Sequence, residues 1–220
     1  MTPKIIEERK LWKQGYAHVA CIDEVGRGAL AGPVVAAAVS IDMRFLSSAK
    51  DSLAELRMNF PRLKDSKKLS PKRRGEIYTR VVRHSGIRWG IGTVSEKVID
   101  KINIFQATKL AMKRAIANLQ KKTSVDFLVI DGNSSLPVSI PQASVVKADE
   151  KVFSCALASV IAKVTRDRLM HRYHRLYPQY GFDRHKGYGT RFHLAQLKRL
   201  GPCDIHRKTF APMAYHTHQR

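Results

Sequence analysis

Cysteine is scarce in this chain, and a long apolar run is lacking. The 220 residues include three cysteines, Cys21, Cys155 and Cys203, which are far apart and form no Cys-x-x-Cys pair. This spacing excludes a disulfide framework and a cysteine zinc site, and it favours buried free thiols for the first two. No apolar stretch approaches the ~20 residues of a membrane span, and segment 1–13 has mixed charge without a signal-peptide core. We therefore expect a cytoplasmic protein that does not enter a membrane.

Acidic residues are also few. The chain has 18 Asp and Glu against 40 Lys and Arg, which gives a formal net charge of +22. Such a charge on a compact chain indicates a polyanionic partner, and nucleic acid is the leading candidate. An anionic membrane surface would need a long basic amphipathic helix with a continuous apolar face, which the sequence does not contain. With 44% hydrophobic residues the chain should fold, and its length favours one domain over two.

Strand and helix patterns alternate along the chain, which predicts an α/β fold. β-branched apolar runs predict strands at 18–22, 33–41, 87–94, 127–130 and 143–146, the first two forming a hairpin. Helical periodicity and capping signals predict helices at 70–84, 95–119, 150–173 and 190–200, of which the second could be two consecutive helices. Segment 1–16 is expected to be a polar arm with some helical character, and segment 42–61 an excursion from the sheet.

Two adjacent carboxylates end the first strand. Asp23 and Glu24 precede the sequence Gly26-Arg27-Gly28. Neighbouring residues of a regular strand point to opposite faces, so these carboxylates can share a metal ion only if the strand ends or twists there, which Gly26 permits. Carboxylates are the ligands that Mg²⁺ prefers, and arginine grips phosphate. In the alternative interpretation one carboxylate is a solvated edge residue and the other pairs with Arg27.

Two further carboxylates stand where a metal site could use them. Asp131 ends the apolar run 127–130, and ligands of α/β sheets gather beyond the carboxyl ends of strands. Its alternative role is to stabilise an Asp-Gly turn. Asp149 precedes the predicted helix at 150–173, where it could also serve as a helix N-cap. Asp167 lies inside that helix and is expected to form an ion pair.

Long stretches of the chain resemble the ribonuclease HII family, the type 2 ribonucleases H, in its bacterial form. The matching motifs occur in the family's order at 23–34, 65–70, 129–132, 147–149, 158–168, 185–190 and 206–210. Because they extend over most of the chain, chance similarity is far less credible than for one short pattern. The resemblance implies a ribonuclease H-like fold, with a mixed central β-sheet flanked by helices and a C-terminal helical segment. It implies one catalytic domain over 1–220, with an N-terminal arm at 1–16 and a substrate-binding segment at 171–220.

The resemblance also implies an activity and its residues. Asp23, Glu24, Asp131 and Asp149 take the four acidic positions that bind Mg²⁺ or Mn²⁺ and catalyse hydrolysis. The implied substrate-binding residues are Gly26, Arg27, Gly28, Lys67 and Tyr188. The expected reaction is two-metal hydrolysis of the RNA strand in RNA/DNA hybrids, and 5′ of ribonucleotides embedded in duplex DNA, leaving 3′-hydroxyl and 5′-phosphate ends. We expect a monomer that works in ribonucleotide excision repair and DNA replication.

Some residues of these motifs have a second possible role. Without the resemblance, core packing would be the ordinary role of Tyr188. The cations in or beside the motifs could contact phosphates or simply form a solvated face; they are Lys67, Lys68, Lys147, Lys163, Arg166, His185 and Lys186. Thr209 stands where the family commonly has serine, and it keeps the hydroxyl. The rival functions are a non-catalytic nucleic-acid-binding protein and a nuclease or integrase of the same fold that acts on ordinary DNA.

Overall fold

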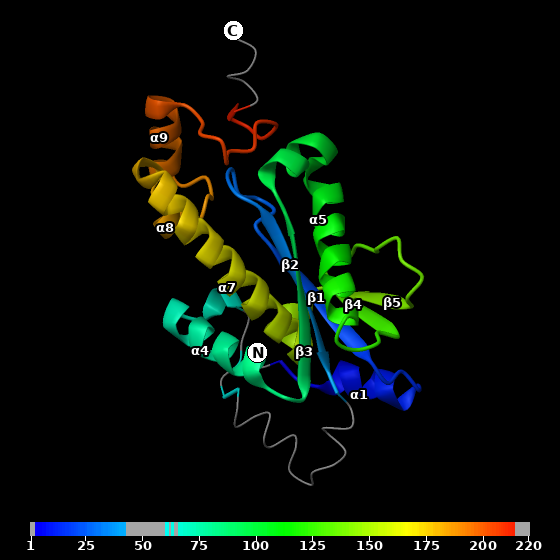
Figure 1. Ribbon diagram of the computed structural model, residues 1–220. Helices are drawn as coiled ribbons and strands as arrows, with labels where there is room; N and C mark the ends of the chain where they lie inside the picture. Colours follow the sequence, from blue (N-terminus) through cyan, green and yellow to red (C-terminus); the bar gives the residue numbers. More distant parts are fainter. Residues whose placement is uncertain (1–2, 43–59, 62, 64–65, 214–220) are drawn as a thin grey trace.

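A mixed β-sheet forms the centre of the molecule (Figure 1). The computed structural model describes residues 3–42, 60–61, 63 and 66–213. Within these ranges the sheet has five strands in the order β3-β2-β1-β4-β5. Their bounds are Val19–Val25 for β1, Val34–Ile41 for β2, Ile87–Val94 for β3, Phe127–Asp131 for β4 and Gln142–Val145 for β5. β2 pairs antiparallel with both β1 and β3. β4 is parallel to β1, and β5 is parallel to β4. The predicted hairpin of the first two strands is confirmed.

Two long helices cover the two faces of the sheet (Figure 1). Helix α5 (Glu96–Gln120) packs against β3 and β2, and α7 (Phe153–Leu176) packs against β2 and β1 on the other side. Gly92 lets α5 approach β3 closely, because a Cβ atom there would lie 1.9 Å from the Ala111 carbonyl oxygen. Asn103 has the non-helical angles φ 63° and ψ 166° inside α5, so α5 consists of two consecutive helices joined at a kink, as expected. The predicted mixed sheet flanked by helices is thus confirmed.

Shorter helices complete the fold around the sheet. Ser70 caps α4 by accepting a hydrogen bond from the Arg73 N–H at 3.3 Å, as its position before Pro71 predicted. The remaining helices are α1 (Ile6–Lys13), α4 (Pro71–Arg83), α6 (Ala148–Lys151), α8 (Phe182–His185) and α9 (Arg191–Leu200), with 3-10 turns at Ser66–Lys68 and Pro178–Tyr180. Across the described residues, no helix is both long and apolar enough to cross a membrane. Most of the predicted excursion, 43–59, lies outside the described residues.

The long helix near the carboxylates begins later than the sequence predicted. A separate turn of helix, α6, comes first, and the chain is extended at Val152 before α7 begins. The break has a tertiary cause: Val152 pairs with Lys4 of the N-terminal arm, and the Phe153 N–H donates to the Lys4 carbonyl at 3.0 Å. Asp149 consequently lies inside α6, and the N-cap residue of α6 is Lys147. The capping interpretation of Asp149 is therefore wrong.

Candidate active site

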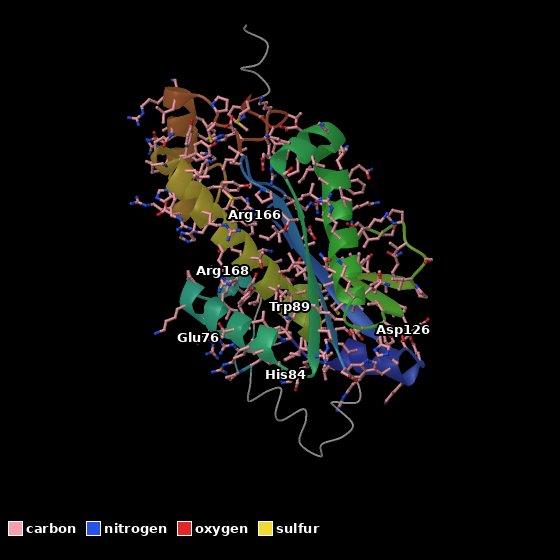
Figure 2. The ribbon with its side chains drawn as sticks, in the orientation of Figure 1. Glu76, His84, Trp89, Asp126, Arg166 and Arg168 are labelled. Atoms are coloured by element: carbon pink, nitrogen blue, oxygen red, sulfur yellow. The ribbon has the colours of Figure 1, made fainter. Side chains whose placement is uncertain are left out.

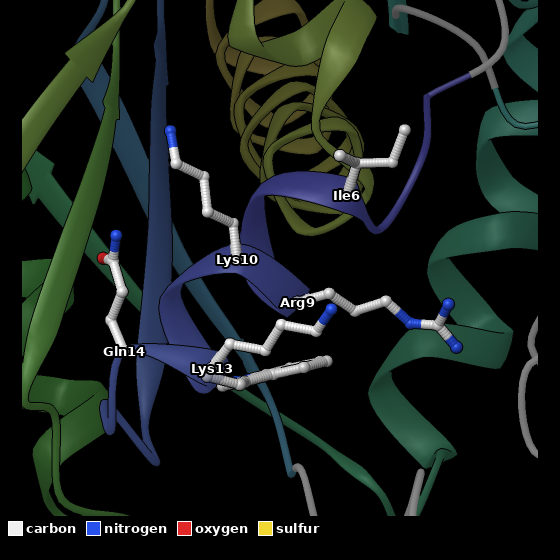
Figure 3. Close-up of a pocket in the computed structure, with 6 residues that line it drawn as sticks. Ile6, Arg9, Lys10, Lys13 and Gln14 are labelled. Atoms are coloured by element: carbon white, nitrogen blue, oxygen red, sulfur yellow. The ribbon is translucent and has the colours of Figure 1, made fainter.

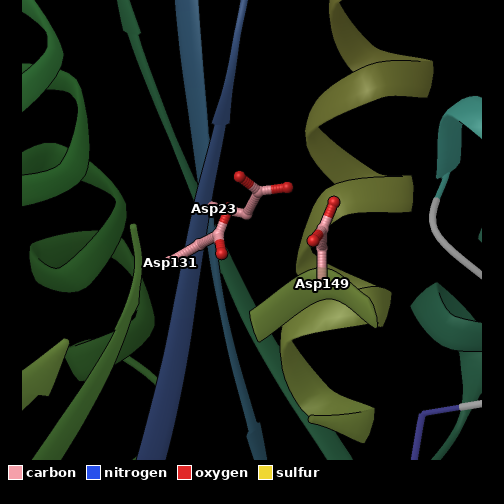
Figure 4. A group of neighbouring side chains, drawn as sticks. All are labelled: Asp23, Asp131 and Asp149. Carbon is pink, nitrogen blue, oxygen red and sulfur yellow. The ribbon is translucent and has the colours of Figure 1, made fainter. Parts of the chain in front are cut away.

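Three aspartate side chains meet beside the carboxyl end of the inner strand β4 (Figure 4). One ligand oxygen from each of Asp23, Asp131 and Asp149 lies within 4.8 Å of the other two. Asp23 and Asp131 meet because β1 and β4 are parallel with Ile22 opposite Ile130, so the next residues of both strands are neighbours. Asp149 reaches them from α6, which packs against β4. The fold thus brings Asp23 to two carboxylates that are more than a hundred residues further along the chain.

Hydrogen bonds hold two of these carboxylates in place. Asp131 Oδ1 accepts from the Ala148 N–H at 2.6 Å, which ties the end of β4 to the turn that carries Asp149. Its hydrogen bond therefore goes to a residue 17 positions away and not to its own Asp-Gly turn. Asp23 Oδ1 accepts from the Glu24 N–H at 2.7 Å. The turn itself is constrained, because Lys147 has φ 59° in the left-handed region that non-glycine residues rarely adopt.

The cluster is electrostatically unfavourable without a cation. Asp23 is only 6% exposed, and burial raises the pKa of its carboxyl well above the ordinary value. The negative charges of Glu24, Asp131 and Asp149 raise that pKa further, while a hydrogen bond from Ser159 lowers it. A divalent cation would remove both the repulsion and part of the desolvation cost. An all-oxygen donor set of this kind suits Mg²⁺ or Mn²⁺.

Glu24 lies beside this cluster and is engaged elsewhere. Its carboxylate Oε1 is 3.2 Å from Arg27 Nη1, so the Arg27 partner of the alternative interpretation is present, but the other carboxylate, Asp23, is buried and not a solvated edge residue. Burial raises the pKa of Glu24, and the Arg27 charge and hydrogen bond lower it. Glu24 nevertheless lines the same cavity as Asp23. That it ligates the same metal site stays a prediction.

A cavity of about 280 Å³ opens onto the carboxylates of Asp23 and Glu24. The described residues that line it are Asp23, Glu24, Val25, Ser66, Lys67, Ser159, Lys163 and Tyr188. Sequence reasoning did not assign the two serines, whose hydroxyl oxygens are 2.8 Å apart in a buried hydrogen bond. Their only sequence signal was a position inside the matching motifs. Because Ser159 also bonds Asp23, the pair links that carboxylate to the turn that carries Lys67.

The basic residues near the cavity have different roles. Lys67 is exposed and its Nζ lies 3.9 Å from Asp149 Oδ2, whereas Lys163 pairs with Asp167 at 2.8 Å. The expected ion pair of Asp167 is therefore present. The prediction that Arg166 is a candidate phosphate contact is wrong. Its side chain is fully buried and donates to the backbone carbonyls of Pro33, Ala31 and Lys186.

The Gly26-Arg27-Gly28 loop follows β1 and is packed against buried arginines. Gly26 has φ +94°, and a Cβ atom there would lie 2.1 Å from Arg166 Nε. Only glycine fits this position. Gly28 is exposed and has no atom within 4 Å of a built Cβ, so the backbone there is open to a ligand. On the inner side, Arg207 donates to the carbonyls of Gly26 and Arg27 at 2.6 and 2.7 Å.

Tyr188 lies on the cavity wall, not in the core. Its ring is half-buried, and the Arg166 guanidinium lies 5.4 Å from the ring centre. The Tyr188 carbonyl is 3.0 Å from His193 Nδ1, and His193 Nε2 is 3.0 Å from His206 Nε2. The core-packing alternative for Tyr188 is therefore wrong, because this half-buried residue lines the same cavity as Asp23 and Glu24.

A second hollow, beside α1, is larger but chemically different (Figure 3). Its volume is about 860 Å³, and its described lining residues are Ile6, Arg9, Lys10, Trp12, Lys13 and Gln14. This described lining offers no carboxylate or imidazole ligand. The carboxylate cavity, although smaller, is the candidate site for metal-dependent chemistry.

Comparison with solved structures defines the class of protein. The ribonuclease H2 of Pyrococcus horikoshii OT3 superposes with a TM-score of 0.68 at 24% identity, covering 90% of this chain and 96% of that one. Bst-RNase HIII, solved in complex with Mn²⁺, has a TM-score of 0.65 at 17% identity and covers 92% of this chain and 70% of that one. These likenesses show that the chain has the ribonuclease H-like fold.

Comparison of sequences then defines the family. The model of the ribonuclease HII family matches residues 20–216, and the chain belongs to that family. The ribonuclease HII of Chlamydia abortus is 49% identical over 210 residues, which are 96% of this chain and 92% of that protein. The expected family resemblance is confirmed. The chain is a metal-dependent endoribonuclease that acts on the RNA strand of RNA/DNA hybrids.

Proposed function

We propose that the carboxylate cavity hydrolyses the phosphodiester on the 5′ side of a ribonucleotide, both in RNA/DNA hybrids and in duplex DNA that contains a single ribonucleotide. The products would carry 3′-hydroxyl and 5′-phosphate ends, and the activity would serve ribonucleotide excision repair and DNA replication. The observation that supports this proposal is the position of the three aspartates, within 4.8 Å of one another, with Asp23 on the strand that leads into the Gly26-Arg27-Gly28 loop and its open backbone at Gly28.

Asp23, Asp131 and Asp149 would hold the metal, and Glu24 would complete the set once its carboxylate leaves Arg27. Two divalent ions, Mg²⁺ or Mn²⁺, would lower the pKa of the attacking water and stabilise charge on the departing oxygen. The partly buried hydrogen bonds of Asp131 and Asp23 keep the carboxylates oriented, so that little reorganisation is needed when the substrate binds.

The residues around the carboxylates would bind and position the substrate. Lys67 and Arg27 are exposed cations beside the cluster and can contact phosphates, which fixes the duplex without reading its sequence. The loop backbone can reach a 2′-hydroxyl, the group that distinguishes RNA from DNA. Tyr188 would pack against the adjacent sugar or base.

A cleavage assay tests the assignment of the site. Purified protein with Mg²⁺ or Mn²⁺ is given a DNA duplex with one internal ribonucleotide, and an all-DNA duplex serves as the substrate control. Asp131→Asn should lose at least about a hundredfold in rate, as expected when a group that stabilises transition-state charge is removed. Glu76→Gln is the matched variant, because it removes one carboxylate from the surface of α4 (Figure 2) and changes the net charge equally.

Two results would contradict the proposal. An uncut ribonucleotide duplex would remove the single-ribonucleotide activity, and equal rates for Asp131→Asn and wild type would remove the metal-site assignment. Binding without cleavage under all metal conditions would favour the rival non-catalytic protein. Cleavage of the all-DNA duplex would favour a nuclease that acts on ordinary DNA.

We further infer that the chain acts as one catalytic domain and as a monomer in the cytoplasm. All three cysteines are free thiols, which fits a reducing compartment. The substrate-binding segment expected at 171–220 begins inside α7, which continues to Leu176, so its structural start lies after that helix. Sedimentation of the purified protein tests the monomer.

A further inference from the structure

Arg207 is a cation buried deep beneath the substrate loop. Its side chain has no exposed surface, and in the described part of the chain it forms no ion pair with a carboxylate. An unpaired buried charge is costly unless hydrogen bonds replace its hydration. Burial lowers the pKa of Arg207 to about 9, so the side chain remains charged at neutral pH. The hydrogen bonds of Arg207 must therefore compensate for the hydration that its charge has lost.

The hydrogen bonds of Arg207 are made to the backbone of a single loop. Nη2 donates to the Gly26 carbonyl at 2.6 Å and Nη1 to the Arg27 carbonyl at 2.7 Å. Nε and Nη2 also donate to the Gly32 carbonyl at 3.0 and 2.9 Å. The planar guanidinium therefore pulls three carbonyl groups of the loop inward. A lysine could not do the same, because its ammonium group lacks the fixed fork of donors.

The direction of these carbonyls determines where the neighbouring N–H groups point. In a planar trans peptide the carbonyl of one residue and the N–H of the next point in opposite directions. With the Gly26 and Arg27 carbonyls held inward, the N–H groups of Arg27 and Gly28 face outward. Both residues are exposed, and neither N–H donates a backbone hydrogen bond within the described residues. The loop thus offers two adjacent donors next to the cavity.

We propose that Arg207 is a positioning residue for ribose recognition: it holds the Gly26 and Arg27 carbonyls inward and so aims the Arg27 and Gly28 N–H groups at the 2′-oxygen of the ribonucleotide. This inference rests on the proposed function, because it requires a ribonucleotide beside the loop. Arg207 itself does not touch the substrate. Its loss should lower the discrimination between ribose and deoxyribose more than it lowers affinity for nucleic acid in general.

Equilibrium binding to two matched duplexes tests the inference. The duplexes share one sequence and differ by one 2′-hydroxyl, and Asp131→Asn is the common background so that neither is cut. The ratio of the two dissociation constants is measured at one salt concentration, because phosphate contacts depend on salt. This ratio does not depend on the fraction of protein that is folded. The Asp131→Asn parent should prefer the ribonucleotide duplex by at least about tenfold, which corresponds to ~1.4 kcal/mol.

Adding Arg207→Lys should bring the ratio close to one while affinity for the all-DNA duplex changes little. Arg74→Lys is the matched control, since Arg74 is also buried and donates to backbone carbonyls, those of Ser66 and Leu69. It should keep the preference of the parent. If Arg207→Lys keeps the preference for the ribonucleotide duplex, the positioning role of Arg207 is overturned, but the proposed function is not. No preference in the parent overturns the proposed ribonucleotide recognition, and this inference with it.

A second variant covers the case in which Arg207→Lys does not fold. Arg207→Ala in the same background leaves space for ethylguanidinium, whose fork can reach the same carbonyls, whereas ethylammonium has only a point charge. The preference for the ribonucleotide duplex should return in ethylguanidinium and not in ethylammonium. Equal ratios in the two salts would overturn the positioning role.

Discussion

Gly26→Ala should destabilise the protein severely, and the contact responsible is visible in the structure. The new methyl group would lie 2.1 Å from Arg166 Nε and 2.7 Å from its Cδ, far inside contact distance. Arg166 cannot move without breaking hydrogen bonds to the carbonyls of Pro33, Ala31 and Lys186. The positive φ of residue 26 adds strain for any residue other than glycine.

The expected magnitude follows from these terms. Hydrogen bonds that involve a charged group contribute about 1.5–3 kcal/mol each, and losing two of the three at Arg166 costs about 3–6 kcal/mol. The left-handed backbone adds about 1 kcal/mol. The sum, about 4–7 kcal/mol, is a large part of the 5–15 kcal/mol by which typical domains are stable. Gly28→Ala is the matched control and should cost less than about 1 kcal/mol, because its Cβ meets no atom.

Urea unfolding, followed by the fluorescence of Trp12 and Trp89, measures both variants. Free energies are compared only if the slopes against urea agree. If the free energy of unfolding of Gly26→Ala lies within about 1 kcal/mol of wild type, Arg166 does not hold the loop through these hydrogen bonds.

Three further predictions concern pH, a hydroxyl and the metal. Burial lowers the pKa of both His193 and His206 to about 4, so the unfolded chain takes up protons first. Their contribution to the free energy of unfolding is complete above about pH 6.5 and is lost as pH falls towards 4. The difference in the free energy of unfolding between wild type and His206→Gln, measured with urea, should therefore shrink over that range. The Thr209 hydroxyl donates to Asp100 Oδ1 at 2.8 Å, so Thr209→Val should cost about 1 kcal/mol in urea unfolding and Thr209→Ser almost nothing. Mg²⁺ or Mn²⁺ should raise the melting temperature of wild type but not of Asp131→Asn, and chelation should stop cleavage without stopping binding; cleavage in chelator would contradict the metal site.

Local sequence signals predicted most of the fold correctly. The strand at 87–94 and the helix from Pro71 were expected within a residue or two, because apolar periodicity and the Ser70 cap act over short distances. Asp131 was expected at the carboxyl end of a strand for the same reason. Its meeting with Asp23 depends on the register between β1 and β4, which no local pattern specifies.

The features that the sequence did not predict depend on distant partners. The break at Val152 needs Lys4, almost 150 residues earlier. Arg166 and Arg207 look like surface cations in a sequence with 40 basic residues. Their burial is possible only because the fold gathers inward-facing carbonyls around them. The sequence alone therefore suggested phosphate contacts for Arg166, where the structure shows a scaffold.

Helix α7 carries several of these contacts along one side. Ser159 meets the carboxylates, Lys163 lines the cavity, Arg166 supports the loop, and Met170 packs under Gly32. The spacings of three and four residues keep these side chains in phase. Inserting one residue would turn everything beyond it by about 100°. An insertion or deletion within this stretch would therefore separate the loop contacts from the carboxylate contacts even if each of these side chains were kept.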